Sequence, residues 1–339
     1  MPSIDDHFTE FEESLQARKR FTESEIVRRC AEDPIARSFV PEDAPWNAPH
    51  RLMAAVQLLI LRGAVSDYRG HADPWEAFRD ILNAHRDWVS DFVLHHNIQT
   101  NEVQRCFALV PILLSIARTT RKPLDLLELG TSGGLNLCCD RYRYHYQAGE
   151  WGAQSSELEL TGNEAPDAHV PEDLLRQQVE IRRRRGIDLN PVDVRTDEGV
   201  RLLECFLLGD SRRVERLRRA AAVARSSSLE LIRGDYLEIV PELLKSRNGD
   251  ALTVVFQTFS TIYLPLDAPE RLNRLISEAG REMPLAWIST PTPEEQGQTR
   301  QESLGDVEAY PIELTMWPGG ERRTVARISN AGDSLQWIG

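Results

Sequence analysis

The stretch Leu124–Asn136, LDLLELGTSGGLN, decides the fold. Four leucines among its first six residues predict a buried strand. A glycine-rich turn follows from Gly130 to Gly134, and Leu135–Cys139 is predicted to begin a helix. A strand, a glycine turn and a helix N-terminus together form a corner at which nucleotides bind. Glycine suits this corner because it lets the backbone approach a ligand closely.

The spacing of the glycines favours one class of nucleotide. A dinucleotide fingerprint requires G-x-G-x-x-G, whereas this chain has Glu-x-Gly-x-Ser-x-Gly from Glu128 to Gly134. That frame resembles motif I of class I S-adenosylmethionine (SAM)-dependent methyltransferases, with Ser132 where glycine is usual. The resemblance implies that the backbone around Gly130, Ser132 and Gly134 holds SAM and that Glu128 helps to position it. Asn136 is expected either to contact the ligand or to cap the helix. The alternative is that the glycines serve only the turn.

Composition narrows the functional class further. The 339 residues suggest one large domain or two ordinary ones, and 41% of them are hydrophobic, enough for a sizeable core. The net charge of -13 disfavours non-specific binding to nucleic acid or an anionic membrane. The five cysteines form no C-x-x-C and no zinc-ligand spacing. We therefore expect a cytoplasmic protein with reduced thiols, no metal site, and no nucleic-acid or membrane partner; the sequence leaves the oligomeric state open.

The order of expected elements predicts an α/β fold. Residues 1–121 are expected to form an all-helical N-terminal domain, and residues 122–339 a Rossmann-like, methyltransferase-type domain with an insertion at about 142–185. Strands are predicted at Leu124–Leu129, Ile187–Leu189, Leu229–Arg233, Leu252–Phe256 and Leu285–Ser289, with helices between them. Tyr310–Trp317 and Arg323–Ile328 are predicted to form a closing hairpin. A doubly wound parallel sheet with a C-terminal antiparallel hairpin is typical of class I methyltransferases.

Polar residues follow several of these strands, at the edge where α/β sheets bind ligands. Asp188 is expected to accept the ribose hydroxyls, although with Asn190 it could simply form a turn. Asp235 is expected near the adenine amino group, the alternative being an N-cap. Tyr236 could pack on the adenine face. Gln257, directly after the central strand, completes the predicted cofactor contacts.

Other residues are candidates for substrate binding and catalysis. Gln99 and Asn101 precede a predicted helix in the segment QTNE and are expected to contact the substrate, although Asn101 could be only an N-cap. Glu102, in the same segment, is the predicted general base. Tyr263 is expected to orient the substrate. Tyr144, among alternating aromatic and arginine residues, is a further substrate candidate, the alternative being a half-buried strand.

The chain also resembles the bacterial family DUF2332, a domain of unknown function, over nearly its whole length. The segments that carry the resemblance are Gln99–Glu102, Glu128–Tyr144, Gly186–Val192 (GIDLNPV), and Arg233–Leu237 (RGDYL) with the following PELL. The resemblance implies a histidine at the position that Gln257 occupies, so a candidate base is missing from this chain. It implies no reaction, because the family has none assigned.

These observations predict a SAM-dependent methyltransferase that acts on a small or medium-sized molecule. The helical N-terminal region and the insertion are expected to build its substrate cavity. The main alternative is a non-catalytic or regulatory module that binds SAM or another nucleotide on a degenerate methyltransferase fold; the missing base favours it. A third alternative is a different reaction on the same fold, such as aminopropyl transfer or nicotinamide chemistry.

Overall fold

The computed structural model describes residues 3–265, 267–291, 303–304 and 307–339. The chain divides into two compact units, each of which is discontinuous in sequence. The first comprises Met1–Thr100 and Thr196–Glu215, and the second Asn101–Arg195 and Arg216–Gly339. The predicted domain boundary between residues 121 and 122 stays a prediction.

The first unit is helical, as the N-terminal sequence predicts. Its helices are α1 (Ile4–Ala17), α2 (Phe21–Glu32), α3 (Pro34–Arg37), α4 (Ala48–Leu61), α5 (Pro74–Ala84), α6 (Arg86–His95) and α9 (Asp197–Cys205), with the 3-10 turn η1 (Tyr68–Gly70). Aromatic side chains including Phe8, Phe78 and Phe206 are buried in its core. The side chain of Asp73 caps α5 by accepting hydrogen bonds from two backbone N–H groups of the first turn.

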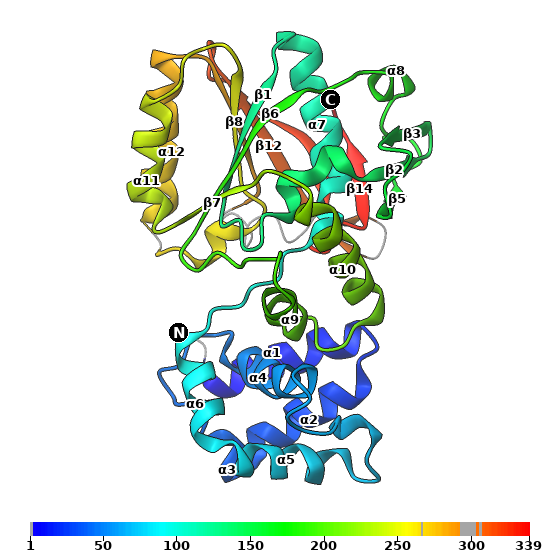
Figure 1. The fold of residues 1–339 in the computed structure, drawn as a ribbon, viewed down its shortest axis with the longest axis vertical. Coiled ribbons are helices and arrows are strands. Elements are labelled where there is room, and N and C mark those ends of the chain that lie inside the picture. The colour runs from blue at the N-terminus through cyan, green and yellow to red at the C-terminus, as the bar shows by residue number, and fades with distance from the viewer. Residues whose placement is uncertain (1–2, 266, 292–302, 305–306) are drawn as a thin grey trace. The chain divides into compact units, whose positions relative to one another are not determined.

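A nine-stranded sheet forms the centre of the second unit (Figure 1). Its order is β5-β14-β13-β12-β9-β8-β1-β6-β7. The strands are β1 (Leu124–Leu129), β5 (Asn163–Glu164), β6 (Ile181–Asp188), β7 (Glu230–Arg233), β8 (Leu252–Phe256), β9 (Leu285–Ser289), β12 (Tyr310–Met316), β13 (Arg322–Ile328) and β14 (Ser334–Trp337). The five strands from β9 to β7 in this order are mutually parallel. By contrast, β12 runs antiparallel to β9, β13 to β12, and β14 to β13.

Helices cover both faces of the parallel strands. Figure 1 shows α11 (Tyr236–Lys245) and α12 (Ala268–Glu282) on one side of the sheet and α7 (Cys106–Thr120) on the other. All residues of β1, β8 and β9 are buried. Continuous burial is expected of parallel strands with both faces covered. The bounds predicted for these three strands are confirmed, as is the closing hairpin, which continues into the unpredicted strand β14.

The predicted bounds of the second strand were wrong. β6 begins at Ile181 rather than Ile187, so the run Arg182–Arg185 belongs to a strand, with Arg182 and Arg183 exposed and the next two arginines buried. Arg182 donates to both carboxylate oxygens of Asp125 on β1, at 3.0 and 2.8 Å. Arg184 donates to Asp140 at 2.6 Å. These acidic partners allow arginine side chains to be placed along a strand of the main sheet.

The remaining elements surround the sheet. The segment between β1 and β6 contains a small sheet of β2 (Arg143–Tyr146), β3 (Gly149–Gly152) and β4 (Glu159–Thr161), and the helix α8 (Glu172–Leu175). The helix predicted after the glycine turn is a 3-10 helix, η3 (Leu135–Arg141). The chain also forms η2 (Val103–Arg105), α10 (Ser211–Arg225), η4 (Ser260–Tyr263), β10 (Ser303–Leu304) and β11 (Val307–Glu308). In the described part of the chain, no helix combines the length and apolar character needed to cross a membrane.

The order of the parallel strands defines a ligand-binding edge. From β1 the chain continues outward to β6 and β7, and it then returns to place β8 on the opposite side of β1. The order therefore reverses between β1 and β8. In open α/β sheets ligands bind outside the carboxyl ends of the strands at such a switch point. We call this place the switch point below.

Candidate functional site

Asp188 ties the glycine turn to the end of β6. Its side chain is buried; one carboxylate oxygen accepts a hydrogen bond from the backbone N–H of Ser132, at 2.8 Å. The other accepts from the N–H of Asn190, also at 2.8 Å. Asp188 thus lies at the carboxyl end of β6, where a ribose contact was predicted, and it also shapes the loop itself. The ribose contact stays a prediction.

Asn101 supports the same loop from a different part of the chain. Its side-chain oxygen accepts from the N–H groups of Gly133 and Leu135, at 3.2 and 3.1 Å. The other loop N–H groups bond to main-chain carbonyls: those of Gly130 and Thr131 to Ile187, and that of Gly134 to Thr131. Every backbone N–H from residue 130 to residue 135 therefore has an acceptor within the protein. A phosphate group at a helix N-terminus requires such donors to point at it.

The conformation of the loop explains its glycines and makes its serine unusual. Gly130 has φ +71°, and a Cβ there would lie 2.4 Å from the Cβ of Ser260. Gly134 has φ +73°, with Leu231 close behind it. Ser132 also adopts the left-handed region, at φ +53°, although it carries a side chain. Its hydroxyl is buried and has no hydrogen-bond partner among the described residues.

Glu128 lies behind the loop, in the interior. Thr131 donates to one carboxyl oxygen at 2.6 Å, and Asn136 donates to the other at 3.1 Å. Burial raises the pKa of Glu128 to about 8, against the two hydrogen bonds, which lower it. The oxygen of Asn136 in turn accepts from the thiol of Cys106 at 3.3 Å. Glu128 and Asn136 therefore hold each other in place; their predicted cofactor contacts stay predictions.

Three more hydroxyls belong to the helical turns that follow β7 and β8, at the start of α11 and in η4. Asp235 caps α11 by accepting from the N–H of Leu237 at 2.8 Å, so the N-cap interpretation is confirmed for this residue. Tyr236 follows; burial raises the pKa of its phenol, and the neighbouring Ser260 hydroxyl acts in the opposite direction. The hydroxyls of Tyr236, Ser260 and Thr261 are buried, and none has a hydrogen-bond partner of good geometry in the described part of the chain. With Ser132 they form a set that we call the switch-point hydroxyls.

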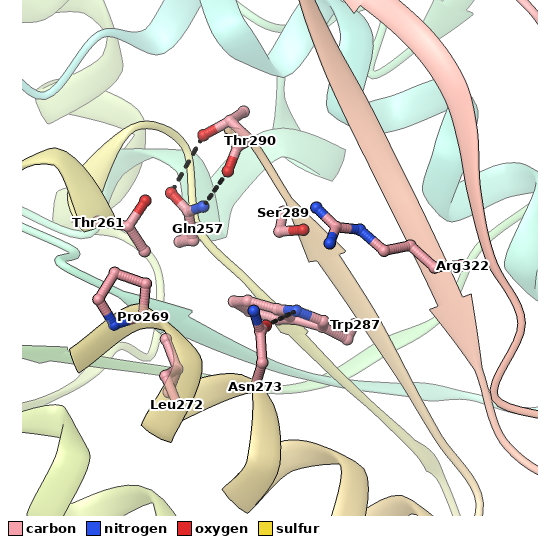
Figure 2. Close-up of a pocket in the computed structure, with 9 residues that line it drawn as sticks. All are labelled: Gln257, Thr261, Pro269, Leu272, Asn273, Trp287, Ser289, Thr290 and Arg322. Atoms are coloured by element: carbon pink, nitrogen blue, oxygen red, sulfur yellow. Dashed lines mark hydrogen bonds between the residues drawn. The ribbon is translucent and has the colours of Figure 1, made fainter. Parts of the chain in front are cut away.

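Gln257 fixes the turn after β8, as Figure 2 shows. It is fully buried, and its amide donates to the carbonyl oxygen of Thr290 at 2.8 Å. Its oxygen accepts from the backbone N–H of Ser260 at 3.0 Å and from the Thr290 hydroxyl at 3.1 Å. Phe259, in the same turn, has φ +63°, a left-handed conformation that is uncommon for a bulky residue. The amide of Gln257 is therefore engaged within the protein.

A small cavity adjoins this turn (Figure 2). Its volume is about 10 Å³, which holds about one water molecule. It is lined by Gln257, Thr261, Pro269, Leu272, Asn273, Trp287, Ser289, Thr290 and Arg322. Figure 2 shows the Arg322 guanidinium near Ser289, and Arg322 forms an ion pair with Glu313. A nucleoside is far larger than this cavity, so the cavity itself is too small to hold one.

The predicted catalytic residues lie in different environments. Glu102 is buried; it caps η2 through the N–H of Gln104, at 3.4 Å, and forms an ion pair with Arg216 at 3.2 Å. Arg216 also donates to the side chain of Gln104 at 2.6 Å. Tyr263 ends η4 and is 48% exposed. Glu102 is thus part of a hydrogen-bonded cluster, whereas Tyr263 is accessible.

The three predicted substrate residues differ in their surroundings. Tyr144 is fully buried in β2, and its hydroxyl donates to the carbonyl oxygen of Cys139 at 2.6 Å. This matches the alternative of a half-buried strand, with Tyr144 on its buried side. Gln99 is buried in the first unit, one residue before its boundary. Asn101 begins the second unit, where it supports the glycine turn.

Sequence motifs did not single out Thr131, Ser260 or Thr261. The sequence signal for the two residues after β8 was the hydroxyl-rich stretch QTFSTIY.

Among the described residues, no group of three or more His, Cys, Asp or Glu side chains is arranged to hold a metal ion.

Comparison with known proteins assigns the chain to a family. No curated protein matches it. The sequence model of the family described as "Uncharacterized protein conserved in bacteria (DUF2332)" matches residues 6–337. Because this match spans nearly the whole chain, the protein belongs to the DUF2332 family.

Proposed function

We propose that this protein is a SAM-dependent methyltransferase for a small or medium-sized molecule. One observation carries the proposal: the switch-point hydroxyls border the place where the strand order reverses. Buried polar groups nearly always have a hydrogen-bond partner, so each exception requires an explanation. Four such groups from the loops after β1, β7 and β8 are explained together by a polar ligand at this edge.

The hydrogen-bonding groups of the site favour a nucleoside without phosphates. The N–H groups of the glycine turn are already used by the protein, which disfavours a phosphate there. Asp188 and Asp235 lie at the carboxyl edge and are acceptors, which suit the ribose hydroxyls and the amino group of an adenine. SAM offers both groups and carries no phosphate, so the residues present fit it.

Local strain in the loops also supports a binding site at the switch point. Ser132 and Phe259 both adopt the left-handed region, one after β1 and the other after β8. Non-glycine residues in this region cost of order 1–3 kcal/mol and concentrate at functional sites. The switch-point hydroxyls are closed to solvent, so we expect the loops that carry them to part when the ligand enters.

SAM, when bound, supplies a methyl group on a sulfonium centre. The chain then has to hold the nucleoside and align the acceptor with that methyl group. Asp188 and Asp235 are the proposed nucleoside contacts, and Gly130 lets Ser260 lie close to the glycine turn. Tyr263 is the proposed acceptor-orienting residue because it is exposed beside the carboxyl end of β8.

A second candidate is a regulatory module that binds SAM without transferring its methyl group. The environment of Glu102 favours it, because the predicted base is tied to Arg216 and to the cap of η2. Transfer of radiolabelled methyl from SAM to the small-molecule fraction of a bacterial extract distinguishes the two candidates. Label in a product supports an enzyme; binding without label in repeated extracts supports the module.

Calorimetric titration with SAM and S-adenosylhomocysteine tests the shared part of both candidates. We expect micromolar binding of both, and no binding of ATP or NAD. Gly130→Arg and Asp188→Ala should abolish it, whereas Gly249→Arg should not, because a Cβ at Gly249 meets no atom within 4 Å. Failure of the wild-type protein to bind either ligand overturns the proposed function.

A further inference from the structure

Ser132 carries two costs, one in its backbone and one in its side chain. Its backbone is left-handed, at φ +53°, in a chain that uses glycine for the neighbouring left-handed positions 130 and 134. Its hydroxyl is buried without a partner; the whole residue is only 7% exposed. An alanine would avoid the cost of the unpaired hydroxyl, and a glycine would avoid both costs.

The donor inventory of the loop indicates what the hydroxyl is for. All backbone N–H groups from residue 130 to residue 135 donate to protein acceptors. An anionic group of a ligand beside this loop therefore finds no backbone donor there. The Thr131 hydroxyl donates to Glu128, so Ser132 Oγ remains as an unused side-chain donor in this loop.

We infer that Ser132 is a specificity-determining residue whose hydroxyl donates a hydrogen bond to the carboxylate of the amino-acid end of the ligand. This rests on the proposed function, because it takes SAM and S-adenosylhomocysteine as the ligands. The carboxylate is the only anionic group of these two molecules. The protein accepts an unpaired hydroxyl in the unliganded loop and recovers the hydrogen bond when the ligand binds.

The test separates stability from affinity. Ser132→Ala removes the hydroxyl and keeps the Cβ, so the unliganded variant should unfold at a temperature about 2–4 °C higher than wild type. Its affinity for S-adenosylhomocysteine should fall about 3- to 10-fold, the effect of one lost hydrogen bond. Its affinity for methylthioadenosine, which lacks the amino-acid end, should not change.

Ser156→Ala is the matched control in the same unit. The Ser156 hydroxyl donates to the carbonyl of Leu158 at 3.1 Å and accepts from its N–H at 3.2 Å. This variant should unfold at a lower temperature and bind both ligands as wild type does. The two serines should therefore change the unfolding temperature in opposite directions.

The other outcomes overturn the inference in distinguishable ways. Equal losses for both ligands in Ser132→Ala would place the contact away from the carboxylate. Unchanged affinity would remove Ser132 from the site, and a lower unfolding temperature would show that its hydroxyl has a structural partner. Each of these leaves the proposed function standing if wild type binds S-adenosylhomocysteine. If wild type binds neither SAM nor S-adenosylhomocysteine, the proposed function fails and the inference fails with it.

Discussion

The carboxylate of Asp188 accepts a hydrogen bond of 2.8 Å from the backbone N–H of Ser132, 56 residues earlier in the chain. This bond joins the end of β6 to the turn after β1 and fixes the loop beside the switch point. A carboxylate in this position has two tasks under the proposed function: to hold the loop and to receive the ligand. Substitutions at Asp188 must therefore be evaluated for stability before they are interpreted as losses of ligand contacts.

Asp188→Asn should destabilise the protein. The amide has one acceptor oxygen, so it cannot accept from both Ser132 and Asn190 as the carboxylate does. A buried N–H left without an acceptor costs about 1–3 kcal/mol, which urea unfolding would measure. Asp193→Asn is the control: Asp193 is exposed and pairs with Arg195, and its loss should cost at most about 1 kcal/mol. Equal stability of Asp188→Asn and wild type would contradict the loop-holding role.

Gly130→Ala should lower the free energy of unfolding by more than the conformational penalty alone. The left-handed backbone costs an alanine about 1–2 kcal/mol. The new Cβ would also lie 2.4 Å from the Cβ of Ser260, and such overpacking adds about 1–3 kcal/mol. Urea unfolding of the purified variant measures the sum.

Two further variants isolate the clash at Gly130. Gly249 has φ +77°, and a Cβ added there would meet no atom within 4 Å, so Gly249→Ala should show the conformational penalty only. Ser260→Gly removes the opposing Cβ, so the double variant Gly130→Ala/Ser260→Gly should be less destabilised than the sum of the single variants. Strict additivity would exclude direct contact between positions 130 and 260.

Glu128 should make stability depend on pH. Its pKa in the folded protein is about 8, raised from 4.5 by burial. Between these values the folded state binds more protons than the unfolded state, so the stabilising contribution is complete below about pH 4.5 and is lost as pH rises towards 8. Glu128→Gln keeps the shape and removes the charge, so its stability relative to wild type should rise between pH 5 and pH 8, by up to about 1.4 kcal/mol per pH unit.

Glu25→Gln is the control for this pH profile. Hydrogen bonds from Arg28 and Arg29 lower the pKa of Glu25 to about 2. The contribution of a group with a lowered pKa is present above its unfolded value and is lost only as pH falls. The difference between Glu25→Gln and wild type should therefore stay constant from pH 5 to pH 8. A constant difference for Glu128→Gln as well would show that Glu128 is ionised across this range.

Local sequence predicted the strands that are mostly apolar. β8 and β9 could be bounded to the residue because each is a short apolar run on a covered sheet. β6 could not, since four consecutive arginines indicate a solvated segment. Arg182 and Arg183 are exposed and Arg184 and Arg185 are buried; Arg182 pairs with Asp125 and Arg184 with Asp140, each more than 40 residues away in sequence. Long-range ion pairs of this kind leave no periodic signal.

The candidate site likewise contains residues that local sequence could predict and contacts that it could not. Gly130 and Asp188 were predicted because a glycine turn and a strand-terminal carboxylate are local patterns. That Asp188 accepts from the loop, and that Ser132 has an unpartnered hydroxyl, depend on contacts between separate strands. Tyr144 was predicted to face a substrate because aromatic and arginine residues alternate in its segment. Such alternation defines two faces, but it does not say which face the tertiary structure buries.

Arg185 allows a final prediction about the sheet. It lies in β6 and is 7% exposed; its buried Nε has no hydrogen-bond partner, and its side chain forms no ion pair with the described part of the chain. Its neighbour Arg184 is equally buried but donates to Asp140 at 2.6 Å. A buried charge without a partner is costly, and its replacement by an apolar residue of similar length relieves that cost.

Arg185→Met should therefore stabilise the protein by about 1–4 kcal/mol in urea unfolding, at constant ligand affinity. Arg184→Met should act in the opposite direction, by about 2 kcal/mol or more, because it leaves Asp140 without its closest cation. The two substitutions differ by one position and exchange the same residue types, so opposite signs would isolate the effect of the acidic partner. Destabilisation by both substitutions would show that the Arg185 guanidinium has an anionic partner in solution. Titration of wild type and of Arg185→Met with inorganic phosphate or chloride would then show whether the variant has lost ion binding.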